Sequence, residues 1–236
     1  MVIAWWPIMP VVISIPLYAA GGLTFPILAY FVVEGYRHTS NLKKYMLRIF
    51  IFGAIAAIFH PLVFSSIFLN IMFTIIMGLI SLILYDKMKI RPLFWVVFVI
   101  LCLLTLIPIQ FDWAIIGIIV ILLSHIIRDE TKRRTVPAIV GGLFMLLFSL
   151  SGVWAFNNPK AYIDIPGMDA TLMLVSTSFI IGCIFAALLL KNYSGERGRK
   201  MKWFFYVFYP LHLAVLGGVA WAMGIVDYSA FRILGL

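Results

Sequence analysis

The chain has 236 residues, of which 64% are hydrophobic and only 11% are charged. Soluble domains carry about 25% charged residues, so this composition leaves too little polar surface to face water and excludes a soluble globular protein. The formal net charge of +9 raises the question of nucleic-acid binding. However, the basic residues form short clusters between apolar runs, where membrane topology explains them. We therefore expect an integral protein of the lipid bilayer that binds no nucleic acid.

Nine apolar runs follow one another along the chain, and most approach the roughly 20 residues that a helix needs to cross a bilayer. They cover residues 2–19, 22–36, 45–60, 66–85, 93–109, 113–127, 136–156, 170–190 and 203–225. Because the runs are continuously apolar, they lack the alternation of a membrane β-barrel. We predict an all-α integral membrane fold, a polytopic bundle of about nine transmembrane helices in one domain over residues 1–236. The number is eight if the two N-terminal runs form one element broken by prolines.

The basic residues predict the orientation of these helices. Sixteen of the eighteen Lys and Arg residues lie in alternate connections: Arg37, Lys43, Lys44, Arg48, Lys87, Lys89, Arg91, Arg128, Lys132, Arg133, Arg134, Lys191, Arg197, Arg199, Lys200 and Lys202. Only Lys160 and Arg232 lie in the other set of connections. By the positive-inside rule the basic loops are cytoplasmic. We expect a multi-pass protein of the cell membrane with an extracytoplasmic C-terminus.

No motif in the sequence predicts a metal site. The two cysteines, Cys102 and Cys183, both lie inside apolar runs and are typical of small hydrophobic residues. The chain has no CxxC, no HExxH and no acidic cation-binding loop.

Ionisable groups within membrane spans are costly, so each is a functional candidate. His212 lies well inside the last run, one turn after Tyr209. A neutral imidazole there could act as a general base or proton shuttle, or it could hydrogen-bond to a neighbouring helix. Asp112 begins the sixth run at the expected outer face, where it could orient a base, contact a substrate or cap the helix.

Two further polar residues mark the expected outer ends of spans. Asn70 opens the fourth run, and we expect it to cap that helix or to line a substrate path. His60 ends the third run, where it could be structural or line the same substrate path, and where interfacial solvation is the simpler interpretation.

A charged segment follows the second run, at the expected inner face. It contains Glu34, Arg37, His38, Lys43 and Lys44. A carboxylate beside four possible cations could organise a pocket for the phosphates of a nucleotide-like donor. Alternatively, the segment enforces topology and contacts anionic lipid.

Four motifs resemble the TraX family of conjugation-associated membrane acetyltransferases, and they occur in the same order. GGLTFPILAYFVVEGYRHTSNLKKYMLR resembles the family signature of a Phe-Pro helix that runs into E-G-[FY]-x-H-T-x-N and a basic stretch. LNIMFTIIMGLISLIL and FDWAIIGIIVILL resemble the next two conserved helices. FYVFYPLHLAVLGG matches the closing F-Y-x-x-H-L motif, with Tyr209 and His212 in register.

The resemblance implies acyl transfer at the membrane. The family is named for a conjugation protein that acetylates the N-terminus of pilin, and it is similar to wider transmembrane acyltransferases. On this analogy the donor is acetyl-CoA or another acyl-CoA, and the acceptor is a pilin-like peptide or a glycan. The inner loop with Arg37, Lys43 and Lys44 would face CoA, and His212 would line the reaction path.

The chain departs from the family pattern in its first helix. At the family's spacing, an Asp-His pair falls on Ala4 and Trp5, and a Gly-Arg pair falls on Gly21 and Gly22. Neither alanine nor indole can accept a proton from an acceptor group. The sequence therefore leaves two hypotheses open: a TraX-like acyltransferase, and a non-catalytic assembly, immunity or partner protein of a membrane complex. A transporter or channel ranks last because charges within the spans are nearly absent.

Overall fold

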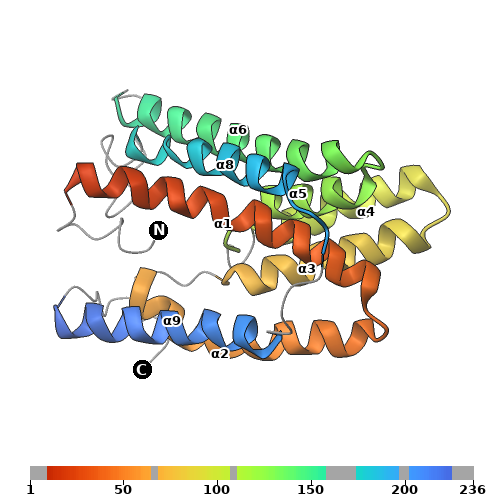
Figure 1. Ribbon diagram of the computed structural model, residues 1–236, viewed down its shortest axis with the longest axis horizontal. Helices are drawn as coiled ribbons and strands as arrows, with labels where there is room; N and C mark the ends of the chain where they lie inside the picture. The colour runs from red at the N-terminus through yellow and green to blue at the C-terminus, as the bar shows by residue number, and fades with distance from the viewer. Residues whose placement is uncertain (1–9, 65–68, 107–110, 158–173, 197–201, 225–236) are drawn as a thin grey trace. The chain divides into compact units, whose positions relative to one another are not determined.

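The computed structural model describes residues 10–64, 69–106, 111–157, 174–196 and 202–224. In these ranges the fold is helical, apart from one isolated bridge between Leu69 and Phe111. The helices are α1 (Val11–His38), α2 (Leu42–Phe64), α3 (Ile71–Lys87), α4 (Arg91–Leu104), α5 (Ala114–Ile126), α6 (Glu130–Phe156), α8 (Phe179–Lys191) and α9 (Lys202–Ala222) (Figure 1). Five of them are long and apolar enough to cross a membrane: α1, α2, α6, α8 with the turn before it, and α9.

The N-terminal region is one helix over its described part. This matches the second of the two predictions, in which the two N-terminal runs form one element. We expected a division between residues 19 and 22, but α1 runs through it for 28 residues, with Pro16 and Pro26 inside the helix. The glycine pair at this point serves helix packing, as described below. The expected runs from 45 onward otherwise match helices with shifted ends, and α3, α4 and α5 are short, with 17, 14 and 13 residues.

The chain forms two compact units, which we describe separately. Unit 1 contains Met1–Phe31 and Leu123–Ser194, and so most of α1 together with α6 and α8. Unit 2 contains Val32–Leu122 and Gly195–Leu236, and so α2, α3, α4, α9 and most of α5. The single domain expected from the sequence stays a prediction.

In unit 1, α1 and α8 cross at two glycines with their backbones in contact. A Cβ atom on Gly22 would lie 2.0 Å from the carbonyl oxygen of Phe179, and one on Gly182 would lie 1.7 Å from that of Ala19. The thiol of Cys183 donates to the carbonyl oxygen of Gly22 at 3.2 Å. Small residues drive such close approach in membranes, because lipid supplies no hydrophobic force between helices.

Helix α8 also packs along α6, and Figure 1 shows the two side by side. A Cβ on Gly142 of α6 would lie 2.7 Å from the Cβ of Cys183. Ala138, Ala186 and Ala187 form a buried cluster between the same two helices. Small side chains therefore hold α8 against both of its neighbours in unit 1.

A polar network joins the ends of these helices. The Glu130 carboxylate accepts from Arg133 at 2.6 Å, from Arg134 at 2.8 Å and from the Tyr30 hydroxyl at 3.0 Å. Arg134 also donates to the backbone oxygen of Tyr193 at 2.6 Å. The Arg133 side chain is only 5% exposed. Because a buried guanidinium needs a countercharge and hydrogen bonds, Glu130 is a structural partner of Arg133.

In unit 2, α2 and α9 lie side by side and run in the same direction (Figure 1). The rings of Phe52 and Tyr206 stack at 5.5 Å, and further along both helices Gly217 packs against Leu62. At the beginning of this pair, the Tyr36 hydroxyl donates to Asp86 at 2.7 Å. That bond brings the end of α1 to the end of α3, so the basic connections after both helices lie at one end of unit 2.

Candidate functional site

Asn70 caps α3 at the level of the middle of α2. Its side chain is wholly buried, and its Nδ2 donates to the backbone oxygen of Gly53 at 2.8 Å. Its Oδ1 accepts from the backbone N–H of Met72 at 3.1 Å, which is the capping bond expected from the sequence. Because Gly53 lies halfway along Leu42–Phe64, the start of α3 lies about 17 Å from the start of α2.

Asp112 lies in a tight turn beside this cap. Its backbone N–H donates to the oxygen of Leu69 at 2.8 Å, and its backbone oxygen accepts from the Thr74 hydroxyl. The carboxylate accepts a hydrogen bond from the backbone N–H of Trp113. Trp113 itself has φ 60°, a left-handed conformation that is uncommon for a bulky residue. Strained backbone of this kind concentrates at functional sites.

This turn lies level with the middle of α2, because Asn70 contacts Gly53 there and Asp112 contacts Leu69 beside it. The expected position of Asn70 and Asp112 at the outer face of the membrane stays a prediction. Helices α3 and α5 have only 17 and 13 residues, fewer than the roughly 20 that span a bilayer. Irregular backbone at such depth is tolerated only where protein buries it or where it lines a cavity.

Tyr209 of α9 completes the polar cluster. Its hydroxyl accepts from the backbone N–H of Ile71, at the first turn of α3, and lies close enough to the Asp112 carboxylate to interact electrostatically. We call Asn70, Thr74, Asp112 and Tyr209 the polar break of unit 2. The structure thus brings together Tyr209 and Asp112, two predicted site residues that lie far apart in the sequence.

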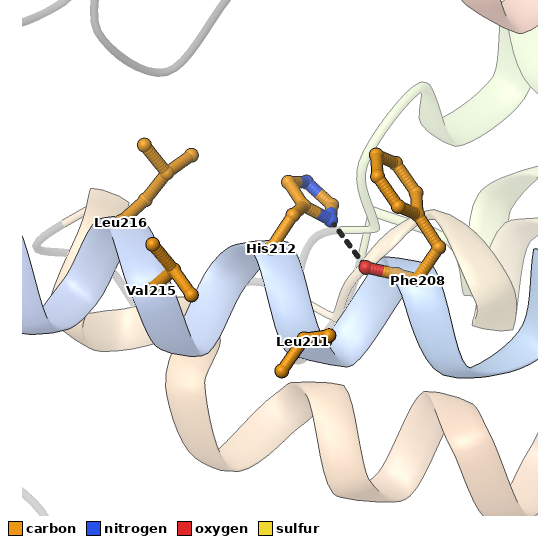
Figure 2. Close-up of a pocket in the computed structure, with 5 residues that line it drawn as sticks. All are labelled: Phe208, Leu211, His212, Val215 and Leu216. Carbon is orange, nitrogen blue, oxygen red and sulfur yellow. Dashed lines mark hydrogen bonds between the residues drawn. The ribbon is translucent and has the colours of Figure 1, made fainter.

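His212 lies one turn further along α9, on its surface within unit 2. Figure 2 shows its ring beside Phe208, where Nδ1 lies 3.1 Å from the backbone oxygen of Phe208. Because a carbonyl oxygen only accepts, a neutral imidazole carries its proton on Nδ1 and keeps a lone pair on Nε2. The ring centroid lies 5.2 Å from that of Tyr209. His212 therefore borders the polar break through Tyr209.

The hollow around His212 is shallow and apolar. Its lining consists of Phe208, Leu211, His212, Val215 and Leu216 (Figure 2). Since all five come from α9, the hollow is a surface feature of one helix and not an enclosed pocket.

The His60 side chain is buried, in contrast to the exposure expected from the sequence. We expected a solvated side chain at the interface, but His60 is 2% exposed and belongs to the core of unit 2. Its place near the end of α2 in the sequence suggested exposure, whereas α2 continues to Phe64 and packs along α9.

The predicted donor-binding residues divide into two groups. Glu34 lies 4.0 Å from Arg37 and 3.8 Å from the His38 ring, so this carboxylate neutralises cations of its own helix. Lys43 and Lys44 are exposed in the first turn of α2. The two lysines therefore supply most of the accessible positive charge among the five predicted residues.

Sequence reasoning missed Thr74 of the polar break and Arg48, which lies one turn after Lys44. Thr74 follows Asn70 by four residues, a spacing that places both on one face of a helix. That spacing was the available signal. Arg48 carried no signal beyond its charge, because the ring over which its guanidinium lies belongs to Tyr206 of α9.

These features define a class: helical membrane proteins with several spans and a partly buried polar break between them. A family model described as "TraX protein" matches residues 2–220, and the chain therefore belongs to the TraX family. The chain is also similar to the "Probable fimbrial assembly protein FimC, serogroup H1" of Dichelobacter nodosus. The two are 26% identical over 215 residues, which cover 83% of this chain and 79% of that protein. No solved structure matches the chain.

Proposed function

We propose that this TraX-family protein transfers an acetyl or other acyl group from acyl-CoA to a membrane-associated acceptor. The observation that carries the proposal is the polar break, in which the half-buried Asp112 and Tyr209 interact level with the middle of α2 and Tyr209 lies beside His212. Costly polar groups at such depth are typical of functional sites. The fimbrial name of the relative supports a pilin-like peptide as acceptor, and a glycan is the other acceptor class.

The orientation belongs to the same proposal. The described helices cross the cell membrane with the basic connections in the cytoplasm and the C-terminus outside. The bond between Tyr36 and Asp86 supports this, since it gathers two basic connections at one end of unit 2. Acyl-CoA then reaches the protein from the cytoplasmic side.

His212 acts as the general base in this reaction. Its Nε2 takes a proton from the acceptor amine or hydroxyl, whose lone pair then attacks the thioester carbonyl carbon. A C–N or C–O bond forms, the C–S bond breaks, and CoA leaves as a thiolate that takes the proton back from the imidazolium. Asp112 and Tyr209 stabilise the charged imidazolium. This role falls to His212 because Ala4 and Trp5 cannot accept a proton.

The donor phosphates bind at the beginning of α2. Lys43 and Lys44 are exposed there, and the helix N-terminus adds its partial positive charge. Arg37 and His38 lie at the end of α1, only a few residues before these lysines. Glu34 keeps these two side chains in place and limits their contribution.

A second candidate function is non-catalytic assembly of a membrane complex. The observation that favours it is the α1–α8 crossing, where the backbone of Phe179 occupies the space of any side chain at residue 22. The family resemblance expects an arginine at this position. A membrane protein partner would then replace the small-molecule donor.

The test is calorimetric binding of acetyl-CoA to the purified full-length protein. We expect saturable binding that a Lys43→Ala/Lys44→Ala double variant weakens at least tenfold and that a Lys87→Ala/Lys89→Ala control retains. His212→Ala should still bind the donor but fail to transfer the acetyl group to a peptide amine. Absence of binding at millimolar acetyl-CoA by the folded protein would exclude the acyltransferase and favour the assembly function.

A further inference from the structure

Arg48 is a half-buried cation at the beginning of the α2–α9 pair. Its guanidinium carbon lies 5.8 Å from the centre of the Tyr206 ring, and the group is close enough to the Tyr45 hydroxyl to interact electrostatically. Its Nε is buried and has no hydrogen-bond partner among the residues that the structure describes. The Tyr206 ring thus lies beside the guanidinium, while the Nε–H donor has no partner within the described ranges.

No carboxylate neutralises Arg48 in the described part of the chain, where the ion pairs involve other cations. Three acids of unit 2 have partners other than Arg48: Glu34 faces Arg37 and His38, Asp86 accepts from Tyr36, and Asp112 accepts from the Trp113 backbone. Burial of a charge without a countercharge costs free energy. In contrast, Arg133 of unit 1 is buried with Glu130 as its partner. The contrast indicates that the anion for Arg48 comes from a ligand.

The chemistry of this anion follows from the neighbours of Arg48. Lys44 lies on the same helix face one turn earlier, so two cations stand next to each other. A guanidinium and an ammonium side by side bind a phosphate well. The guanidinium donates hydrogen bonds to two phosphate oxygens, and the ammonium adds positive charge. The Tyr206 ring stacks on Phe52 and holds one side of the site rigid.

We propose that Arg48 and Lys44 bind a phosphate group, with Tyr206 as the platform beneath the guanidinium. This inference deepens the proposed function, on which it rests where the phosphate is that of an acyl-CoA donor. An anionic lipid headgroup offers the same chemistry. Along α2, Arg48 precedes the level of Gly53 and the polar break by about 8 Å. A phosphate held by Arg48 therefore directs the rest of an elongated donor toward His212.

The experiment compares Arg48→Gln, Arg48→Lys and the exposed control Lys89→Gln in the full-length protein. Removal of a charge-assisted contact weakens binding of acetyl-CoA about tenfold to a hundredfold in Arg48→Gln. Arg48→Lys keeps the charge but loses the fork, so we expect an intermediate loss. Lys89→Gln should stay within twofold of the wild type. S-acetylpantetheine, which lacks the nucleotide phosphates, should bind equally to all four proteins.

The outcomes separate this inference from the proposed function. If the wild type binds acetyl-CoA and Arg48→Gln binds it equally well, the inference is wrong and the function stands. An equal loss of S-acetylpantetheine binding would also overturn it, since Arg48 would then act through the fold. If the wild type binds no acetyl-CoA, the function fails. The next measurement would be the stability of the protein in phosphatidylglycerol nanodiscs. If these nanodiscs stabilise the wild type but not Arg48→Gln, the phosphate belongs to a lipid headgroup. If they stabilise both proteins equally, the phosphate site is refuted.

Discussion

Replacement of Gly22 by alanine tests the packing of unit 1. The new Cβ would lie 2.0 Å from the carbonyl oxygen of Phe179, whereas ordinary contacts begin at 3.4 Å, so α1 and α8 must separate by about 1.4 Å at the crossing. A gap of about 1 Å already forfeits up to half of the dispersion energy of the lining atoms. Overpacking against backbone costs about 3 kcal/mol, while alanine gains about 1 kcal/mol of helix propensity over glycine. The net destabilisation is therefore about 2 kcal/mol.

The assay is thermal unfolding of the detergent-solubilised protein, with Gly218→Ala as the matched control. Gly218 also lies inside a helix, but a Cβ there would meet nothing within 4 Å. At about 2–4 °C per kcal/mol for a chain of this size, Gly22→Ala should lower Tm by about 4–8 °C. Gly218→Ala should leave Tm unchanged or raise it by a few degrees. Equal Tm values for the two variants would refute the backbone crossing.

Three further substitutions test the polar contacts. Asn70→Ala removes the cap of α3 and the hydrogen bond to Gly53, so we expect the free energy of unfolding to fall by about 2–3 kcal/mol and Tm to fall with it. An unchanged Tm in the same melting assay would contradict these two hydrogen bonds. Glu130→Gln leaves the buried Arg133 without a countercharge and should lower Tm by several degrees; high salt should narrow the difference if solvent reaches the pair. His212→Gln should abolish acetyl transfer but retain acetyl-CoA binding and Tm, and residual transfer above a tenth of the wild-type rate would exclude His212 as the base.

The helices of this protein were largely predictable, because bilayer thickness imposes a minimum length on apolar runs. The main difference concerns α1, where the apolar runs 2–19 and 22–36 predicted either two spans or one element broken by prolines, and the described part is one continuous helix. A helix in lipid keeps its backbone hydrogen bonds intact, so a glycine inside it does not act as a stop signal. Gly22 instead permits contact with Phe179 of α8, a residue far away in the sequence. Only the tertiary structure reveals which of these two roles a glycine has.

Most residues of the candidate site could be singled out from the sequence, but their level along the helices could not. Asn70 was identifiable as a cap because a short polar side chain precedes an apolar run. Its level in the bundle depends on Gly53, the α2 residue whose backbone it binds. In the same way, the approach of Tyr209 to Asp112 depends on how α9 packs against α3, which no local pattern encodes. The sequence therefore singled out Asn70, Asp112 and Tyr209, but neither Thr74 nor the assembly of the four residues.

The departures from the family pattern in the first helix are part of the packing of unit 1. The expected arginine at residue 22 does not fit, because the Phe179 backbone already occupies the position of its Cβ. Gly22→Arg would thus separate α1 from α8 instead of restoring a functional group. In the proposed function, acyl transfer uses the polar break of unit 2, where Asp112 and Tyr209 interact electrostatically and His212 keeps a lone pair on Nε2. Substitutions in unit 2 consequently test the proposed enzyme more directly than reversion of the first helix.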